Sequence, residues 1–109
     1  MAEADILLEA DIEFCNMLKM FFVKNYQNLF NDIQKSIDTG EIEAAYRLVH
    51  SLKSNSAQIG KTNLQKAAAD VEALLKNGQN NVTEPLLKNL KMELNAVLNE
   101  LSSLLNEEQ

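Results

Sequence analysis

The sequence predicts an all-α protein, an antiparallel up-down four-helix bundle with a short accessory N-terminal helix. Two observations carry this prediction. Only three Gly and one Pro occur in 109 residues, which leaves few turn signals for strands and hairpins. Apolar residues recur at steps of three and four along stretches rich in Leu, Ala, Lys, Glu and Gln, which all favour helix. A chain of this length, residues 1–109, is expected to form a single domain.

Residues that interrupt helices gather at three places in the chain, 38–40, 60–62 and 78–85. The connections at these places are short, so consecutive helices are expected to pack antiparallel to one another. The three breaks divide the chain into predicted helices over about 12–37, 41–59, 63–77 and 84–106.

The N-terminal part of the chain predicts two elements. Apolar residues at 6–8 indicate a short accessory helix over about 3–9. Asp11 is a candidate N-cap for the long helix 12–37, because its carboxylate can accept hydrogen bonds from the first free amides. The core stripe predicted for this helix consists of Ile12, Cys15, Leu18, Phe22, Tyr26, Leu29, Ile33 and Ile37.

The other three helices carry their own start and stop signals. The pairs Asp38/Glu41 and Thr62/Gln65 have the spacing of a capping box. Gly78 suits the left-handed position after a helix, and Pro85 suits a first turn. The leucines of the last helix predict a core stripe. A dimeric coiled coil is the disfavoured alternative, since the repeat lasts only about three heptads.

Composition excludes several classes of function. The net charge of −6 argues against nucleic acid as a partner, because phosphate backbones require a basic face. A single Cys permits no intrachain disulfide and no cysteine metal cluster. No apolar run approaches the roughly 20 residues of a membrane span, and acidic residues interrupt the start where a signal peptide would lie. We therefore expect a cytoplasmic location, no membrane contact by this domain and no metal or other cofactor.

The only histidine, His50, is predicted to face solvent. Successive helical residues are about 100° apart, which puts the apolar residues of 41–59 on the side opposite His50. Lys53, Ser54, Ala57 and Arg47 fall within about 60° of the His50 direction. An exposed imidazole is largely neutral near neutral pH and can act as a nucleophile.

The region around His50 is locally basic, although the whole chain is acidic. Between Glu43 and Asp70 the sequence contains no Asp or Glu, and its basic residues are Arg47, Lys53, Lys61 and Lys66. A basic window that contains a possible nucleophile indicates an anionic ligand or partner. A transferable phosphoryl group fits, because a Lys ammonium can offset its charge during transfer.

These residues resemble the signature of the histidine phosphotransfer (HPt) domain family. The matching stretch runs from His50 to Gly60, with a Lys three residues after the His, small residues four and seven later, and a Gly ten later. Leu64, a helix ending near Glu72 and the pattern upstream of His50 also fit, so the resemblance covers about residues 11–105. One departure is Ser54, where many members have Gly; we expect it to narrow access only modestly.

The resemblance implies a phosphocarrier without an ATP site, which passes phosphoryl groups between receiver-domain aspartates in a multistep phosphorelay. In that role His50 would be the phosphoacceptor through Nε2, with Nδ1 held by an acceptor that the sequence does not identify. Lys53 would stabilise the phosphoryl oxygens. Ser54 and Ala57 would give clearance to the receiver, and Gly60 would end the helix.

The implied partners are response-regulator receiver domains and a hybrid sensor histidine kinase. The resemblance fits both a free protein and a domain of such a kinase. Arg47 and Phe21 are candidate docking residues. Phe14, Met17 and Phe21 form a second apolar stripe, which either covers residues 6–8 or belongs to the docking patch. A monomer is the default expectation. The alternative function is a non-catalytic helical adaptor, while a di-iron bundle is disfavoured because Arg47, not Glu, lies three residues before His50.

Overall fold

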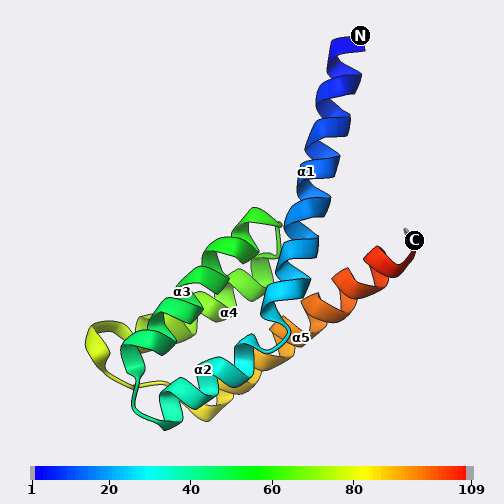
Figure 1. Ribbon diagram of the computed structural model, residues 1–109. Helices are drawn as coiled ribbons and strands as arrows, with labels where there is room; N and C mark the ends of the chain where they lie inside the picture. Colours follow the sequence, from blue (N-terminus) through cyan, green and yellow to red (C-terminus); the bar gives the residue numbers. More distant parts are fainter. Residues whose placement is uncertain (1, 108–109) are drawn as a thin grey trace.

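The computed structural model describes the backbone of residues 2–107 and the side chains of residues 12–104. Within these residues there are helices and connecting turns but no strand, which confirms the all-α class. Figure 1 shows the elements in chain order. They are α1 (Ala2–Tyr26), α2 (Leu29–Asp38), α3 (Ile42–Gln58), α4 (Thr62–Leu74), the 3-10 turn η1 (Lys76–Gly78) and α5 (Glu84–Glu107).

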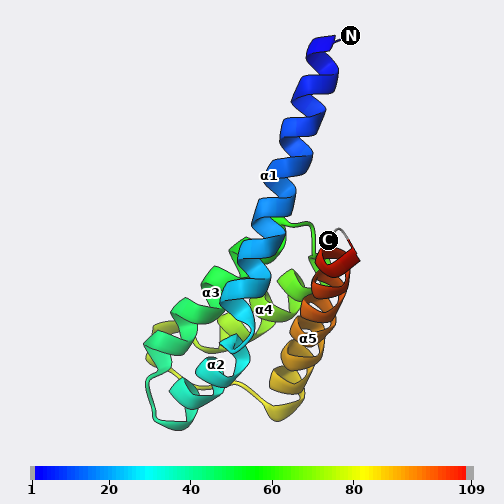
Figure 2. The same ribbon diagram turned by 45° about the vertical axis from the view of Figure 1, so that its right-hand side comes forward.

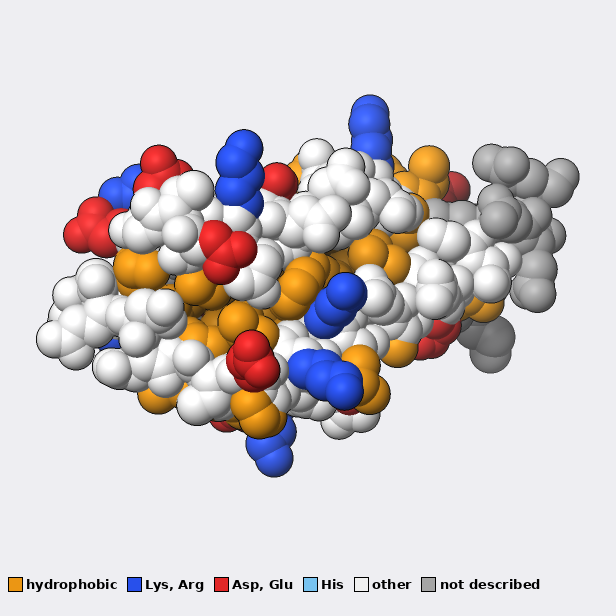
Figure 3. All heavy atoms as spheres, turned by 90° about the horizontal axis from the view of Figure 1, so that it is seen from below, with side chains coloured by type: hydrophobic (Ala, Val, Ile, Leu, Met, Phe, Trp, Pro, Cys, Tyr) orange, Lys and Arg blue, Asp and Glu red, His pale blue; other side chains and the backbone are white. Residues whose placement is uncertain are grey.

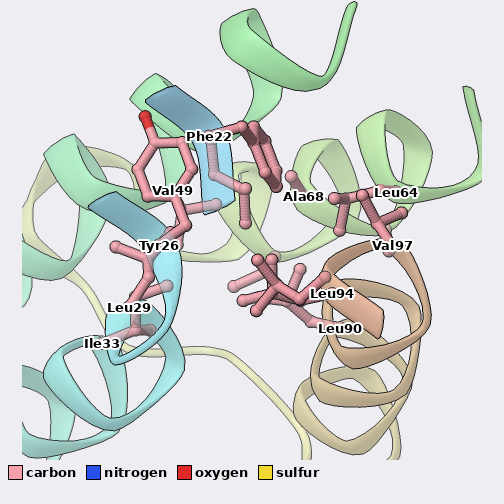
Figure 4. Packing of buried hydrophobic residues seen from close by; sticks show 14 of the residues in the cluster. Phe22, Tyr26, Leu29, Ile33, Val49, Leu64, Ala68, Leu90, Leu94 and Val97 are labelled. Atoms are coloured by element: carbon pink, nitrogen blue, oxygen red, sulfur yellow. The ribbon is translucent and has the colours of Figure 1, made fainter. Parts of the chain in front are cut away.

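The core lies between α2, α3, α4, α5 and the C-terminal end of α1. Figure 4 shows side chains from all five helices pointing toward a common centre. The fully buried members with the largest side chains are Phe22, Ile33, Leu52, Leu64, Leu75, Leu90, Leu94 and Leu101. Five residues of the α5 stripe are buried, so these leucines are core residues of one bundle, as predicted. They are Leu90, Leu94, Val97, Leu98 and Leu101.

The helix predicted over 12–37 is interrupted, and this part of the prediction was wrong. α1 ends at Tyr26 and α2 begins at Leu29, with a change of direction that both ribbon views show (Figures 1 and 2). The Asn25 side chain donates to the carbonyl of Phe21 at 2.8 Å, and such bonds compete with the backbone ladder. The turn lets α2 pack along α3, while most of α1 leaves the bundle.

The separate helix predicted over 3–9 was also wrong, because these residues form the first turns of α1. Neither Gly nor Pro occurs before Gly40, so nothing in the sequence interrupts the helix here. Asp11 consequently lies inside α1 instead of capping it. Ile12 and Cys15, predicted in the core, are exposed because α1 has left the bundle at that point.

The turn between α3 and α4 is closed by Gly60, whose φ is +74°. The Gly60 N–H donates to the carbonyl of Ala57 at 3.1 Å, and the Lys61 N–H donates to that of Ser56 at 2.9 Å. This is the pair of bonds of a Schellman motif, so the predicted helix-ending role of Gly60 is confirmed. The turn brings α4 back along α3, and this pairing positions the site.

Both predicted capping boxes were wrong. The N-cap residues are Glu41 and Lys61, and neither makes a side-chain capping bond. The Schellman turns that precede each helix already set the direction of the chain. α4 is shorter than predicted, because residues 76–78 tighten into η1, where Asn77 and Gly78 have φ values of +61° and +71°.

The surface carries mixed charge. Seen from below, side chains of both signs surround strips of exposed hydrophobic atoms (Figure 3). In the groove between α2 and α5, the Lys91 ammonium lies 5.7 Å from the centre of the Phe30 ring. None of the described helices is long and apolar enough to cross a membrane.

Candidate functional site

His50 lies in the middle of α3, on the side away from the core. Ala45, Val49 and Leu52 of the same helix are fully buried, whereas 54% of the His50 side chain is exposed. The helical phase therefore predicted the direction of His50 correctly. The ring of Tyr46, one turn earlier, is stacked beside the imidazole with 6.0 Å between ring centres and 14° between planes.

Glu72 of α4 holds the inner nitrogen of this ring. Its Oε2 lies 2.9 Å from His50 Nδ1. A carboxylate can only accept in this bond, so Nδ1 carries the proton and Nε2, across the ring, carries the lone pair. Only 7% of Glu72 is exposed, so α4 fixes the carboxylate against α3. The arrangement sets both the tautomer and the orientation of the imidazole.

Lys53 shares the same carboxylate. Its Nζ donates to Glu72 Oε1 at 2.9 Å, so one carboxylate joins the imidazole to the ammonium. Burial alone would raise the pKa of Glu72, but the hydrogen bonds from Lys53 and His50, together with the charge of the Lys53 ammonium, lower it below the ordinary value. Glu72 is therefore ionised at neutral pH. The ammonium keeps two further N–H donors for an incoming group.

Sequence reasoning missed Glu72 and Tyr46 as site residues. The stretch without Asp or Glu that drew attention to His50 ends at Asp70. Glu72, the acidic residue of the folded site, lies just beyond that stretch. The antiparallel turn at Gly60 contains the signal that would have found Glu72. His50 lies ten residues before that glycine and Glu72 lies twelve residues after it, so the two positions face each other across the hairpin.

Three of the other predicted site residues lie on the exposed side of α3, and one lies on α1. Ser54 and Ala57 are exposed on α3 toward its C-terminal end, and Arg47 is exposed toward the start. Arg47 lines a hollow together with Tyr46 and the turn at 75–78. Phe21 is 56% exposed but lies on α1.

The basic window is less positive in space than in sequence. Lys61 Nζ lies 2.7 Å from Glu100 Oε1 of α5, and Lys53 is paired with Glu72. The charged groups in the hydrogen-bonded network of His50 are the Lys53 ammonium and the Glu72 carboxylate. Together, these side chains can hold a proton at His50 Nδ1, present a lone pair at His50 Nε2 and offer the N–H donors of Lys53 to an anion.

Comparison with known protein families agrees with this geometry. Residues 16–102 match the Hpt domain, so the chain belongs to the Hpt domain family. Searches of curated proteins and of solved structures return no match. Hpt domains perform histidine phosphotransfer in phosphorelays, interact there with receiver domains and kinases, and carry phosphoryl groups without an ATP-binding catalytic site.

Proposed function

We propose that His50 accepts a phosphoryl group from the aspartyl phosphate of one receiver domain and passes it to an aspartate of another. The observation that carries this proposal is the bond between His50 Nδ1 and Glu72, because it leaves Nε2 as the nucleophilic atom of a half-exposed ring. The donors and acceptors we expect are response-regulator receivers, and the first donor is a receiver of a hybrid sensor histidine kinase.

The transfer step balances without any added reactant. The Nε2 lone pair attacks phosphorus, a nitrogen–phosphorus bond forms, and the bond from phosphorus to the aspartyl oxygen breaks. The electron pair of that bond leaves with the receiver carboxylate. The Nδ1 proton stays on the ring, where the charge of Glu72 stabilises the positive imidazolium that develops. The reverse sequence of events loads the next receiver.

Lys53 stabilises the phosphoryl oxygens in this proposal. Its ammonium is one helical turn from His50 and 30% exposed, so it can reach a group on Nε2 while one N–H stays with Glu72. The position of Lys53 is defined by that ion pair. Glu72 is thus a positioning residue for both the nucleophile and the ammonium.

Ser54 and Ala57 give the receiver clearance in this proposal, since neither side chain extends far from α3. Arg47 adds attraction for an acidic receiver surface at the other end of the helix. Phe21 is a candidate for apolar contact where α1 joins the bundle. Gly60 supports the site by closing the α3–α4 turn.

The test is transfer of radiolabelled phosphate from a phosphorylated receiver to this chain. Wild type should gain an acid-labile label, and His50→Gln should gain none. Ser51→Ala is the matched control, because Ser51 is the next residue on α3 and is also exposed. Label that survives His50→Gln overturns the assignment.

A non-catalytic adaptor gives the opposite pattern. It binds receivers equally well with and without the His50 and Lys53 side chains, and it gains no acid-labile phosphate.

A further inference from the structure

Tyr46 lies beside the imidazole of His50 but has no part in the transfer step described above. Its ring is nearly parallel to that of His50, with 14° between the planes and 6.0 Å between the ring centres. These values are within the range of offset-stacked aromatic pairs. Tyr46 precedes His50 by one helical turn, so the two side chains share one face of α3. The ring of Tyr46 is therefore an immediate neighbour of the nucleophile.

One hydrogen bond does not fix the direction of an imidazole. The torsion about the Cβ–Cγ bond of a histidine is broad and roughly two-fold, so the side chain sets no sharp ring angle by itself. The hydrogen bond from Nδ1 to Glu72 selects one of the two flipped orientations. The ring can still swing about this bond, and the swing moves Nε2, which lies across the ring from Nδ1. Because 54% of the His50 side chain is exposed, solvent does not resist this motion.

A flat ring beside the imidazole limits the swing. With the two planes nearly parallel, rotation about the Cβ–Cγ bond turns the edge of the imidazole toward the Tyr46 ring. Tyr46 resists displacement because it is half-buried and packs against the core cluster. One turn after His50, the small side chain of Ser54 offers no comparable wall. The restraint on the imidazole therefore comes from the Tyr46 side, and the Ser54 side stays open.

We propose that Tyr46 is a positioning residue for phosphotransfer, whose ring holds the His50 imidazole at the angle that directs Nε2 toward the incoming phosphorus. This inference rests on the proposed function and deepens it. Glu72 sets the tautomer and holds Nδ1, while Tyr46 narrows the rotation that remains. Reacting groups need a narrow range of geometry, because a misplacement of about 1 Å can cost about 100-fold in rate. A loosened imidazole is aimed correctly for less of the time, so transfer slows although the nucleophile is still present.

Other roles for Tyr46 predict different outcomes. If Tyr46 served only the core, as the half-buried Phe30 of α2 does, an apolar Leu would replace it without slowing transfer. If Tyr46 served receiver binding, its loss would raise the receiver concentration that transfer requires, because Tyr46 also lines the hollow beside Arg47. The rate of transfer at saturating receiver separates positioning from both of these roles.

The kinetic test is single-turnover transfer from a phosphorylated receiver, measured over a range of receiver concentrations. Tyr46→Leu should lower the maximal rate about tenfold, the lower end of the effect of losing a partner that orients a histidine at a metal site. The half-saturating receiver concentration should not change. Tyr46→Phe should keep the wild-type rate, because the ring makes the contact. Phe30→Leu is the matched control, since it makes the same kind of change in a half-buried aromatic residue of α2, and it should also keep the wild-type rate.

The ring contact itself is tested by nuclear magnetic resonance without any receiver. His50 is the only histidine of the chain, so its imidazole protons give one set of resonances. At alkaline pH the imidazole is neutral, and the ring current of a stacked aromatic side chain shifts these resonances. The shift should persist in Tyr46→Phe and disappear in Tyr46→Leu.

Four results would each overturn the positioning role. They are an unchanged maximal rate in Tyr46→Leu, an equal loss in Tyr46→Phe, an equal loss in Phe30→Leu, and imidazole resonances that do not respond to Tyr46→Leu. A change confined to the half-saturating concentration would also overturn it and would assign Tyr46 to receiver binding. Wild type that gains no label would instead overturn the proposed function of His50, and the resonances would still report whether Tyr46 holds the ring.

Discussion

His50 Nδ1 and Glu72 Oε2 lie 2.9 Å apart, although 22 residues separate them in the chain. The contact joins α3 to α4 at the one place where an imidazole meets solvent. It gives Nε2 its lone pair and its direction. The site therefore depends on a carboxylate that belongs to the neighbouring helix.

Replacing this carboxylate should slow phosphotransfer. Glu72→Gln keeps the shape but loses the charge that holds the Nδ1 proton and the Lys53 ammonium. We expect a rate about 10- to 100-fold lower, the usual effect of removing a partner that orients a histidine at a metal site. Single-turnover transfer from a phosphorylated receiver measures it. Glu100→Gln, which breaks the ion pair with Lys61, is the control. Equal rates for wild type and Glu72→Gln would contradict the positioning role.

The same carboxylate should make stability depend on acid pH. The pKa of Glu72 is lowered in the folded chain from an ordinary value of 4.5, so folding favours its ionised form. The resulting stabilisation is fully present above pH 4.5 and is lost as the pH falls through the lowered pKa. Urea unfolding should therefore show a steeper loss of stability below pH 4.5 for wild type than for Glu72→Gln. Parallel pH profiles would contradict the ion pairing.

Lys53 should matter for the phosphoryl group more than for the fold. Lys53→Gln removes the ammonium that shares Glu72 with His50, and the transfer rate should fall about 100-fold, the lower end of the effect of removing one donor to a developing charge. Lys53→Arg should recover part of the loss, because the charge remains. The control is Lys66→Gln, an exposed residue of α4 with the same change in charge. If both Gln variants are slowed equally, general charge and not position is responsible.

A larger side chain at Ser54 should block the receiver and leave the domain folded. Ser54 is exposed, so Ser54→Leu should change the free energy of unfolding by no more than about 0.5 kcal/mol. Transfer in both directions should fall at least tenfold, and Ser54→Gly should not slow it. Ser103→Leu, on the exposed side of α5, controls for added apolar surface. Undiminished transfer by Ser54→Leu would rule out contact with the receiver at this position.

Gly60→Ala should destabilise the chain through the backbone alone. The residue has a φ of +74°, and an added Cβ would meet nothing within 4 Å, so strain is the whole cost, about 1 kcal/mol. Gly60→Asn should lose less, because Asn tolerates the left-handed region. Thermal unfolding measures both variants. If Gly60→Asn lost as much stability as Gly60→Ala, the cost would not come from the positive φ of this position.

The sequence predicted what depends on helical phase. The spacing of apolar residues along 41–59 was enough to direct His50 outward and Leu52 inward, because phase is a local property. The role of Gly60 was predictable for the same reason, since a helix that must turn back needs a residue that tolerates positive φ. The core stripe of α5 followed from its leucines.

The features that the sequence did not predict depend on contacts between helices. Glu72 joins the site only through the pairing of α3 with α4, and a linear charge map treats it as distant. The break after Tyr26 has no counterpart in the apolar pattern, because Phe22, Tyr26, Leu29 and Ile33 keep one stripe across it. The apolar periodicity also placed Ile12 in the core. Ile12 is exposed instead, because α1 extends beyond the bundle at that point.

The short turn at 59–61 has a consequence for how the site forms. The side chains of His50, Lys53 and Glu72 all belong to one helical hairpin, residues 42–74. The chain therefore closes only a short loop to bring them together. Contacts of this kind form quickly in folding, before distant elements dock. The candidate site therefore belongs to the most local part of the chain topology, because a single short turn joins the two helices that supply its side chains.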